Sequence, residues 1–234
     1  MTTYFTGDTH GTWDEREKFF KNLNPDDRVI VLGDFGWNWD INHINGFIPN
    51  CEWLSVLGNH ENYNLVEQMP IEERYGGKVR KMKDNVYFLL NGEYYNIDGH
   101  TMFVFGGALS IDMHYRTPYV SWWPQEIPSS KDYENAMTNL EKNGWTMDFL
   151  LTHTCEDRLA KDMFGYEYVI YDPTARMIEE IKNSIAEHKG HYGYHLFGHH
   201  HDNVTKGNCI CMFEDIYDIE MHKVAYDTGD YYGE

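Results

Sequence analysis

The chain has 234 residues, 41% of them hydrophobic, so it is long enough for one substantial domain with a real core. Its 38 acidic and 19 basic residues give a formal net charge of −19 at pH 7. Because affinity for a nucleic-acid backbone comes from clustered lysine and arginine, this charge argues against long nucleic acids as partners.

Targeting, membrane and disulfide signals are weak. The amino terminus lacks a basic segment followed by an apolar core, and no apolar run approaches the length that crosses a bilayer. The four cysteines are too few and too irregularly spaced for a disulfide framework. We therefore expect a single cytoplasmic domain over residues 1–234, without a membrane partner and with 227–234 as a frayed tail. Protein partners cannot be read from the sequence.

Strands and helices alternate in the first part of the chain. Apolar runs at 4–6, 29–32 and 53–57 are predicted strands, each followed by a glycine turn. Helices are predicted over 13–21 and over 40–47. This spacing favours parallel strands joined by crossover helices.

The middle of the chain consists of short β-rich runs, predicted at 78–82, 86–90, 93–97 and 100–105. The turn dipeptides between them are Asp84-Asn85, Asn91-Gly92 and Asp98-Gly99. Asn-Gly and Asp-Gly between strand-like runs are typical of β-hairpins, so we expect an antiparallel group here.

Regular alternation returns towards the carboxyl end. A helix capped by Ser129 or Ser130 and a helix over 172–189 each place apolar residues on one face. Further strands are predicted at 147–152, 194–197, 203–206, 209–216 and 221–227. By themselves the residues indicate a mixed α/β fold.

Five of the apolar runs end by presenting Asp, Asn or His. In chain order the blocks are Gly7-Asp8-Thr9-His10-Gly11, Gly33-Asp34, Gly58-Asn59-His60-Glu61, His153 and Gly198-His199-His200-His201. These side chains are good ligands for borderline divalent metals, and open α/β sheets place ligands at the carboxyl ends of their strands. Any single block suits an ordinary turn equally well, but all five together indicate a metal site.

In this order the blocks resemble those of the calcineurin-like metallophosphoesterase family: Asp-x-His, Gly-Asp, Gly-Asn-His-Glu, His and Gly-His-x-His. The resemblance runs from Asp8 to His201 and so covers most of the chain. It implies an α/β fold arranged as a four-layer α/β/β/α sandwich of two mixed sheets flanked by helices. It also implies a dinuclear-metal phosphoesterase.

The resemblance gives each block residue a role, with Asp34 bridging two metal ions. Asp8, His10 and His201 complete the first metal site, and Asn59, His153 and His199 complete the second. If the last block is extended, His199 and His201 share a side and His200 points elsewhere. Mixed Asp, Asn and His ligation without thiolate favours manganese, iron or zinc over magnesium or calcium.

Hydrolysis of a phosphate ester needs a nucleophile at neutral pH and stabilisation of the phosphoryl oxygens, and two adjacent ions supply both. The expected nucleophile is a hydroxide that bridges the ions. By resemblance, His60 protonates the leaving oxygen, and we expect Glu61 to orient His60. We expect Asn59 and Arg116 to contact the substrate, Arg116 by a bidentate hydrogen bond to phosphate.

The second block departs from one branch of the family. The Ser/Thr protein phosphatases have Gly-Asp-x-Val-Asp-Arg-Gly there, and this chain has Gly33-Asp34-Phe35-Gly36-Trp37, without the arginine. We therefore expect hydrolysis of the phosphate monoester of a small molecule or nucleotide. Two alternatives stay open: a phosphodiesterase or nuclease using the same centre, and a non-catalytic metal-binding scaffold.

Four tryptophans lie in two loop-like segments: Trp37, Trp39, Trp122 and Trp123. They suit either ordinary packing or a rim that stacks a nucleobase beside the site.

Overall fold

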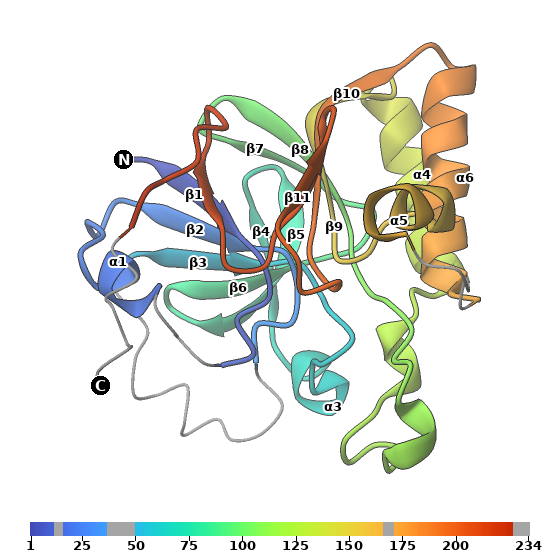
Figure 1. Ribbon diagram of the computed structural model, residues 1–234, viewed down its shortest axis with the longest axis horizontal. Helices are drawn as coiled ribbons and strands as arrows, with labels where there is room; N and C mark the ends of the chain where they lie inside the picture. The colour runs from blue at the N-terminus through green and yellow to red at the C-terminus, as the bar shows by residue number, and fades with distance from the viewer. Residues whose placement is uncertain (12–15, 37–49, 166–170, 227–234) are drawn as a thin grey trace.

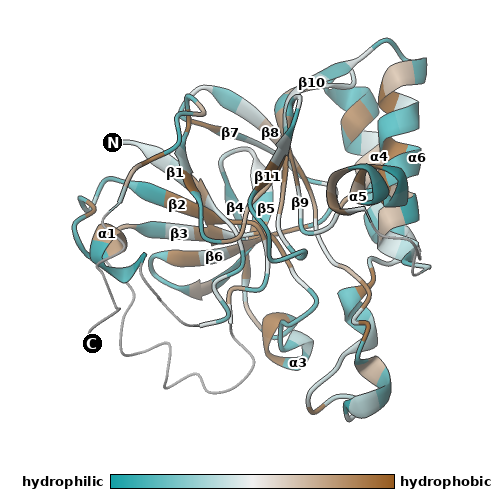
Figure 2. Cartoon of the chain, in the orientation of Figure 1, coloured by the Kyte–Doolittle hydropathy of each residue, from teal (hydrophilic) through white to brown (hydrophobic). Residues whose placement is uncertain are grey.

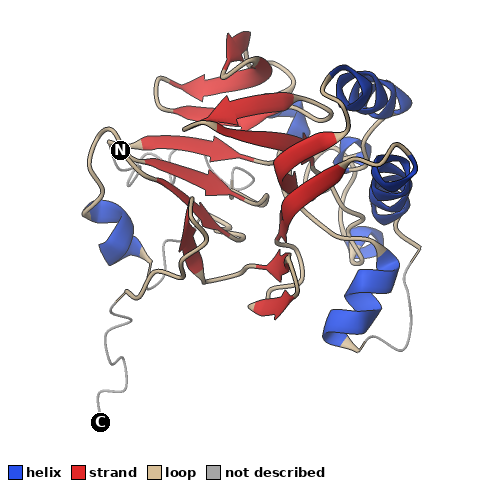
Figure 3. Cartoon of the chain, turned by 90° about the horizontal axis from the view of Figure 1, so that it is seen from above, coloured by secondary structure: helices blue, strands red, loops and turns tan. Residues whose placement is uncertain are grey.

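The computed structural model describes residues 1–11, 16–36, 50–165 and 171–226. They form two sheets packed face to face, with helices on the outside (Figures 1 and 3). The seven-stranded sheet has the order β13-β1-β2-β3-β6-β5-β4, and the six-stranded sheet has the order β11-β12-β10-β9-β8-β7. The predicted α/β/β/α sandwich is confirmed.

The strands of the first sheet are β13 (Ile216–Asp218), β1 (Thr3–Thr6), β2 (Arg28–Val31), β3 (Glu52–Ser55), β6 (Val86–Leu89), β5 (Gly77–Lys83) and β4 (Ile71–Arg74). Those of the second are β11 (Val204–Lys206), β12 (Cys209–Cys211), β10 (His191–Phe197), β9 (Thr146–Thr152), β8 (His100–Phe105) and β7 (Tyr94–Ile97). The α-helices are α1 (Glu17–Lys21), α3 (Tyr63–Val66), α4 (Ser130–Lys142), α5 (Asp157–Phe164) and α6 (Pro173–Glu187). Two 3₁₀ turns, Met113–Tyr115 and Pro124–Glu126, lie between β8 and α4.

Three apolar layers hold the sandwich together. The central layer lies between the sheets and includes Phe5, Leu54 and Leu151. On the outer face of the seven-stranded sheet, Phe20 of α1 packs with β-strand residues. On the outer face of the six-stranded sheet, α4 and α6 contribute residues such as Ile181. The strands accordingly carry hydrophobic residues while the helices are hydrophilic outside (Figure 2).

The centre of each sheet is parallel. In the first sheet β1, β2, β3 and β6 run parallel, and in the second β8, β9, β10 and β12 do so. The outermost strands β13, β11 and β7, and the β4–β5 pair, run antiparallel to their neighbours. Several parallel strands therefore end at one edge, where loops can present ligands.

One predicted hairpin is wrong. Asp84-Asn85 and Asp98-Gly99 do join antiparallel pairs, β5 with β6 and β7 with β8. Asn91-Gly92 instead lies where the chain crosses from one sheet to the other. The crossing is stabilised locally, because Asn91 Oδ1 accepts a hydrogen bond from Gly106 N at 2.7 Å. Gly92 turns with φ 77° beside α4, where a Cβ would lie 2.5 Å from Ala136 N.

Other differences concern short elements. The strand predicted over 209–216 is divided between β12 and β13, which belong to different sheets. The run 221–227 makes only an isolated bridge at Lys223. We did not predict β4, α3 or α5, which are short or lack strong periodicity. The predicted helix over 40–47 and the tail 227–234 lie outside the described residues, as does the start of the helix over 13–21.

Among the described residues, the helices are too short or too polar to cross a membrane.

Candidate metal centre

The five sequence blocks meet at one edge of the sandwich. Asp8, Asp34 and Asn59 follow the adjacent parallel strands β1, β2 and β3, while His153 and the 198–201 block follow β9 and β10 of the other sheet. Because parallel strands finish at the same edge, side chains far apart in the sequence converge there. The structure therefore brings together all seven side chains predicted as ligands.

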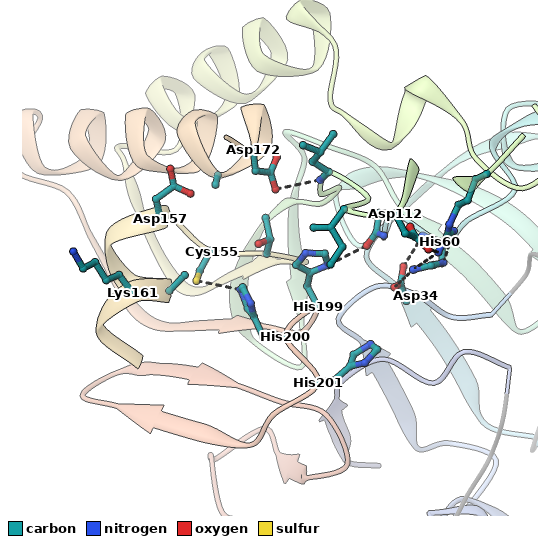
Figure 4. Close-up of a pocket in the computed structure, with 17 residues that line it drawn as sticks. Asp34, His60, Asp112, Cys155, Asp157, Lys161, Asp172, His199, His200 and His201 are labelled. Carbon is teal, nitrogen blue, oxygen red and sulfur yellow. Dashed lines mark hydrogen bonds and ion pairs between the residues drawn. The ribbon is translucent and has the colours of Figure 1, made fainter. Parts of the chain in front are cut away.

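Tight backbone turns present several of these side chains. His10, Asp34, His199 and His201 have φ of 46°, 50°, 65° and 49°. Left-handed backbone is uncommon outside glycine, and such strain tends to gather at functional sites. The prediction of an extended 199–201 segment is therefore wrong. His199 and His201 both face the centre because the chain turns, while His200 points towards Cys155 (Figure 4).

Two glycines in the blocks are required by close approach to ligands. A Cβ on Gly58 would lie 2.1 Å from Asp34 Oδ1, and a Cβ on Gly198 would lie 2.1 Å from Asp8 Oδ1. Any side chain at either position would displace a carboxylate, so these glycines serve the geometry of the centre.

The first group of potential ligand atoms belongs to Asp8, His10 and His201. His10 Nε2 and His201 Nε2 lie 2.9 Å apart, and His201 Nε2 lies 3.1 Å from Asp8 Oδ2. Asp8 is buried, whereas the side chain of His201 is 49% exposed. This group therefore lies on the solvent side of the centre.

The second group lies deeper. Asp8, Asp34 and His153 form one set of nearby ligand atoms, all buried. His153 Nε2 lies 2.9 Å from Asn59 Oδ1, and His199 Nδ1 lies 3.0 Å from the same oxygen. His153 Nδ1 donates to Leu32 O at 2.8 Å, which holds the ring with Nε2 towards the centre.

Asp34 lies between the two groups. Its Oδ1 is 3.5 Å from His153 Nε2, and its Oδ2 is 4.0 Å from His10 Nε2. Oδ1 also accepts a hydrogen bond from His60 N at 2.8 Å, which fixes the carboxylate. One buried carboxylate thus faces both sets of ligand atoms, as a bridge between two metal ions must.

Comparison with known families agrees with this geometry. The sequence model described as calcineurin-like phosphoesterase matches residues 1–203, most of the chain. The chain belongs to the calcineurin-like phosphoesterase family. It is therefore a metal-dependent phosphoesterase of a family that uses two metal ions. A comparison with curated proteins gave no significant match.

The donor atoms of this phosphoesterase suit cations. His10 Nε2 faces His201 Nε2, and Asn59 Oδ1 faces nitrogens of His153 and His199. A neutral imidazole has one N–H and one lone pair, so lone pairs converge at these points unless a positive charge lies between them. Carboxylate, amide and imidazole donors without thiolate fit manganese, iron or zinc.

The charges around His153 also favour a cation. Burial alone would lower the pKa of His153, but the carboxylates of Asp34 and Asp8 outweigh burial and raise the pKa to about 10. Burial would raise the pKa of Asp34, but His153, His60 and His10 hold it well below its usual range. A metal ion would take over the positive charge that His153 carries in the metal-free protein, so metal binding would release a proton.

A buried chain of hydrogen bonds sets the orientation of Asn59. Ser110 Oγ donates to Glu126 Oε2 at 2.7 Å, and Ser110 N donates to Glu126 Oε1 at 2.8 Å. Because its proton is committed to the carboxylate, Ser110 Oγ accepts from Asn59 Nδ2 at 3.0 Å. The amide oxygen of Asn59 is thereby turned towards His153 and His199. Sequence reasoning missed Ser110 and Glu126, which carry no motif.

Arg116 and His60 are in contact. The guanidinium Nη1 donates to His60 Nδ1 at 2.9 Å, and Nη2 makes an ion pair of 2.8 Å with Asp112 Oδ2. Burial lowers the pKa of His60, and the charge of Arg116 adds to this effect while Asp34 opposes it. His60 Nε2 lies 4.0 Å from Asp34 Oδ2, beside the ligand groups.

Glu61 lies under the turn that carries Asp34. Its Oε1 accepts a hydrogen bond from Phe35 N at 2.9 Å. The side-chain contact made to the His60 ring comes from Arg116 instead. Burial and the nearby charge of Asp34 raise the pKa of Glu61 to about 8. The expected role for Glu61 in orienting His60 is therefore replaced by support of the Asp34 backbone.

Two further residues complete the picture. Arg16, buried and not predicted, donates from Nη2 to Asp8 O at 3.0 Å and so holds the first block. Trp123 is buried in the layer with Trp53, so the predicted stacking role is wrong for this residue. Trp37 and Trp39 lie outside the described residues.

Proposed function

We propose that this protein hydrolyses phosphate monoesters of small molecules at a centre of two metal ions. Asp8, His10, Asp34 and His201 would hold one ion, and Asp34, Asn59, His153 and His199 the other. The observation that carries the proposal is the position of Asp34, whose two oxygens face the two groups. When bound, the ions supply an activated water and neutralise charge on the phosphoryl oxygens.

His60 is proposed as the general acid. Its Nε2 lies beside Asp34 Oδ2, where the leaving oxygen of a bound ester would pass, and its backbone N–H is held by Asp34 Oδ1. A histidine near neutral pH can donate a proton to a leaving alkoxide. The contact from Arg116 to Nδ1 would end once the arginine turns to the substrate.

Arg116 is proposed as a phosphate contact. Asp112 and the carbonyl of Ser121 hold its guanidinium next to His60, within a side chain that is 15% exposed. An arginine beside the centre suits a monoester, which presents three non-bridging oxygens, better than a diester, which presents two. Asn59 has one N–H committed to Ser110, so a substrate contact from this residue would use its remaining N–H.

The proposal is tested by hydrolysis assays on metal-stripped protein. Manganese, iron or zinc is added back, and para-nitrophenyl phosphate is compared with the bis ester. We expect metal-dependent turnover, faster on the monoester and lost in Asp34→Asn and His60→Ala. Faster turnover of the bis ester would favour a diesterase. Two bound ions without turnover of either ester would favour a scaffold.

A further inference from the structure

The metal centre opens into a cavity that continues well beyond the predicted ligands. Its volume is about 550 Å³, within the range of roughly 300–1,000 Å³ that is usual for small-molecule sites. One end contains Asp34, His60 and His201, and the other reaches α5 and the start of α6 (Figure 4). A phosphate group alone would leave the second end empty, so the cavity has room for the organic part of an ester.

The far wall of the cavity is mostly uncharged and built from small residues. Ala160 of α5 and Ala175 of α6 line it, and both are buried. Leu109 and Ile111 line it from the segment after β8, and Ile111 is 69% exposed. The thiol of Cys155 is neutral, because burial raises its pKa. Two helices thus face the cavity with alanine where a larger side chain would fill it.

The charges on this wall are unfavourable to a second anion. The first turn of α6 could attract an anion by its free N–H groups, but Asp172 already caps it, accepting from Thr174 N at 2.8 Å. The other oxygen of Asp172 accepts from Leu109 N at 3.1 Å. Asp157 adds a further carboxylate, and the side chain of Lys161 extends away from the ligands in Figure 4.

We propose that the wall formed by Leu109, Ile111, Ala160 and Ala175 binds the organic group of the ester and selects one that is apolar and uncharged. This inference rests on the proposed monoesterase function. It predicts that aromatic or other compact apolar phosphate esters are preferred over bisphosphates, nucleoside polyphosphates and esters that carry a carboxylate. The phosphate end is held by the metal centre, and the apolar end gains by leaving water.

Binding of phosphonates, which are not hydrolysed, tests the wall without turnover. Calorimetry on manganese-loaded protein would compare 1-naphthylmethylphosphonate, the same compound with a ring carboxylate, and inorganic phosphate. We expect the uncharged ring to bind at least about tenfold more tightly than the carboxylated ring. Equal affinities for the two rings would overturn the proposal.

Variants of the wall locate the effect. Ala160→Phe fills the cavity, and Ile111→Asp adds charge at an exposed position where folding is not at risk. Each should weaken binding of the uncharged ring about tenfold while leaving that of inorganic phosphate unchanged. Ala186→Phe, on the exposed side of α6, is the matched control. Unchanged ring affinity in folded Ala160→Phe and in Ile111→Asp would contradict the inference.

Hydrolysis of 1-naphthyl phosphate by the same samples separates the two proposals. Selective binding without turnover would remove the monoesterase function and leave the wall. Turnover without discrimination between the rings would remove the wall and leave the monoesterase function.

Discussion

The two ends of the cavity are built in different ways. At the metal end, predicted ligands sit on tight turns directly after parallel strands, and backbone packing fixes their positions. At the other end, the segment 109–126 has no strand, carries exposed Ile111, Tyr115 and Val120, and holds Arg116 by side-chain contacts. The difference suggests that the sheets fix the chemistry and that loops and helix surfaces choose the substrate.

The two ends are nevertheless joined at one point. Ser110 and Glu126, at the buried base of the segment 109–126, hold the amide of Asn59. The following changes, from largest to smallest expected effect, test how far chemistry and selection are separate.

Asp34→Asn should have the largest effect. Asparagine tolerates the left-handed backbone at this position, so the fold should persist, but a neutral amide cannot bridge two cations as a carboxylate does. We expect kcat/KM for para-nitrophenyl phosphate to fall on the order of 10³-fold or more. Asp26→Asn, at an exposed position, is the control. Retained activity in Asp34→Asn would show that Asp34 is not the bridge.

Ser110→Ala tests the link between the two ends. Without the hydroxyl, the charge of Glu126 no longer sets the orientation of the Asn59 amide, which can turn its N–H towards the ligands. We expect the affinity for one of two metal ions to fall roughly 10- to 100-fold, as is usual for residues that orient ligands. A two-step calorimetric titration with manganese measures this. Ser130→Ala, at an exposed position, should bind both ions normally; identical titrations of the two variants would refute the link.

Arg116→Ala should act mainly on the substrate. A hydrogen bond from a charged donor contributes about 1.5–3 kcal/mol, so we expect kcat/KM to fall roughly 10- to 100-fold. Calorimetric affinity for the metal ions should not change, because Arg116 contacts His60 and Asp112 rather than the predicted ligands. Arg158→Ala, an exposed arginine on α5, is the matched control. If metal affinity falls with activity, Arg116 belongs to the metal end instead.

Glu61→Gln should have the smallest effect, confined to the metal-free protein at higher pH. The folded pKa of Glu61 is raised from 4.5 to about 8, so the unfolded chain loses this proton first and stability falls as pH rises through this window. Glutamine keeps an acceptor for Phe35 N and does not titrate. Thermal melts should therefore show the variant a few degrees more stable than the wild type at pH 8, and equal to it near pH 4.5. A constant difference at both pH values would contradict the raised pKa.

Several predictions from the sequence depended on local patterns and were confirmed. The apolar runs before the five blocks are strands, and the hairpins at Asp84-Asn85 and Asp98-Gly99 formed as their turn residues indicate. Asn91-Gly92 has the same hairpin signature but lies between sheets. Turn chemistry fixes the local bend, whereas long-range pairing decides which strand comes next to which.

The sequence by itself determined the family and the set of candidate ligands, because glycine turns and Asp, Asn and His side chains occur in a fixed order along the chain. Only the tertiary structure decided how those side chains are oriented. Left-handed turns aim His199 and His201, Ser110 and Glu126 orient Asn59, and Glu61 supports Phe35 instead of His60. The cavity wall also came from packing, since its residues lie in separate segments without a motif. Local chemistry is written in neighbouring residues, but orientation and shape depend on contacts between distant ones.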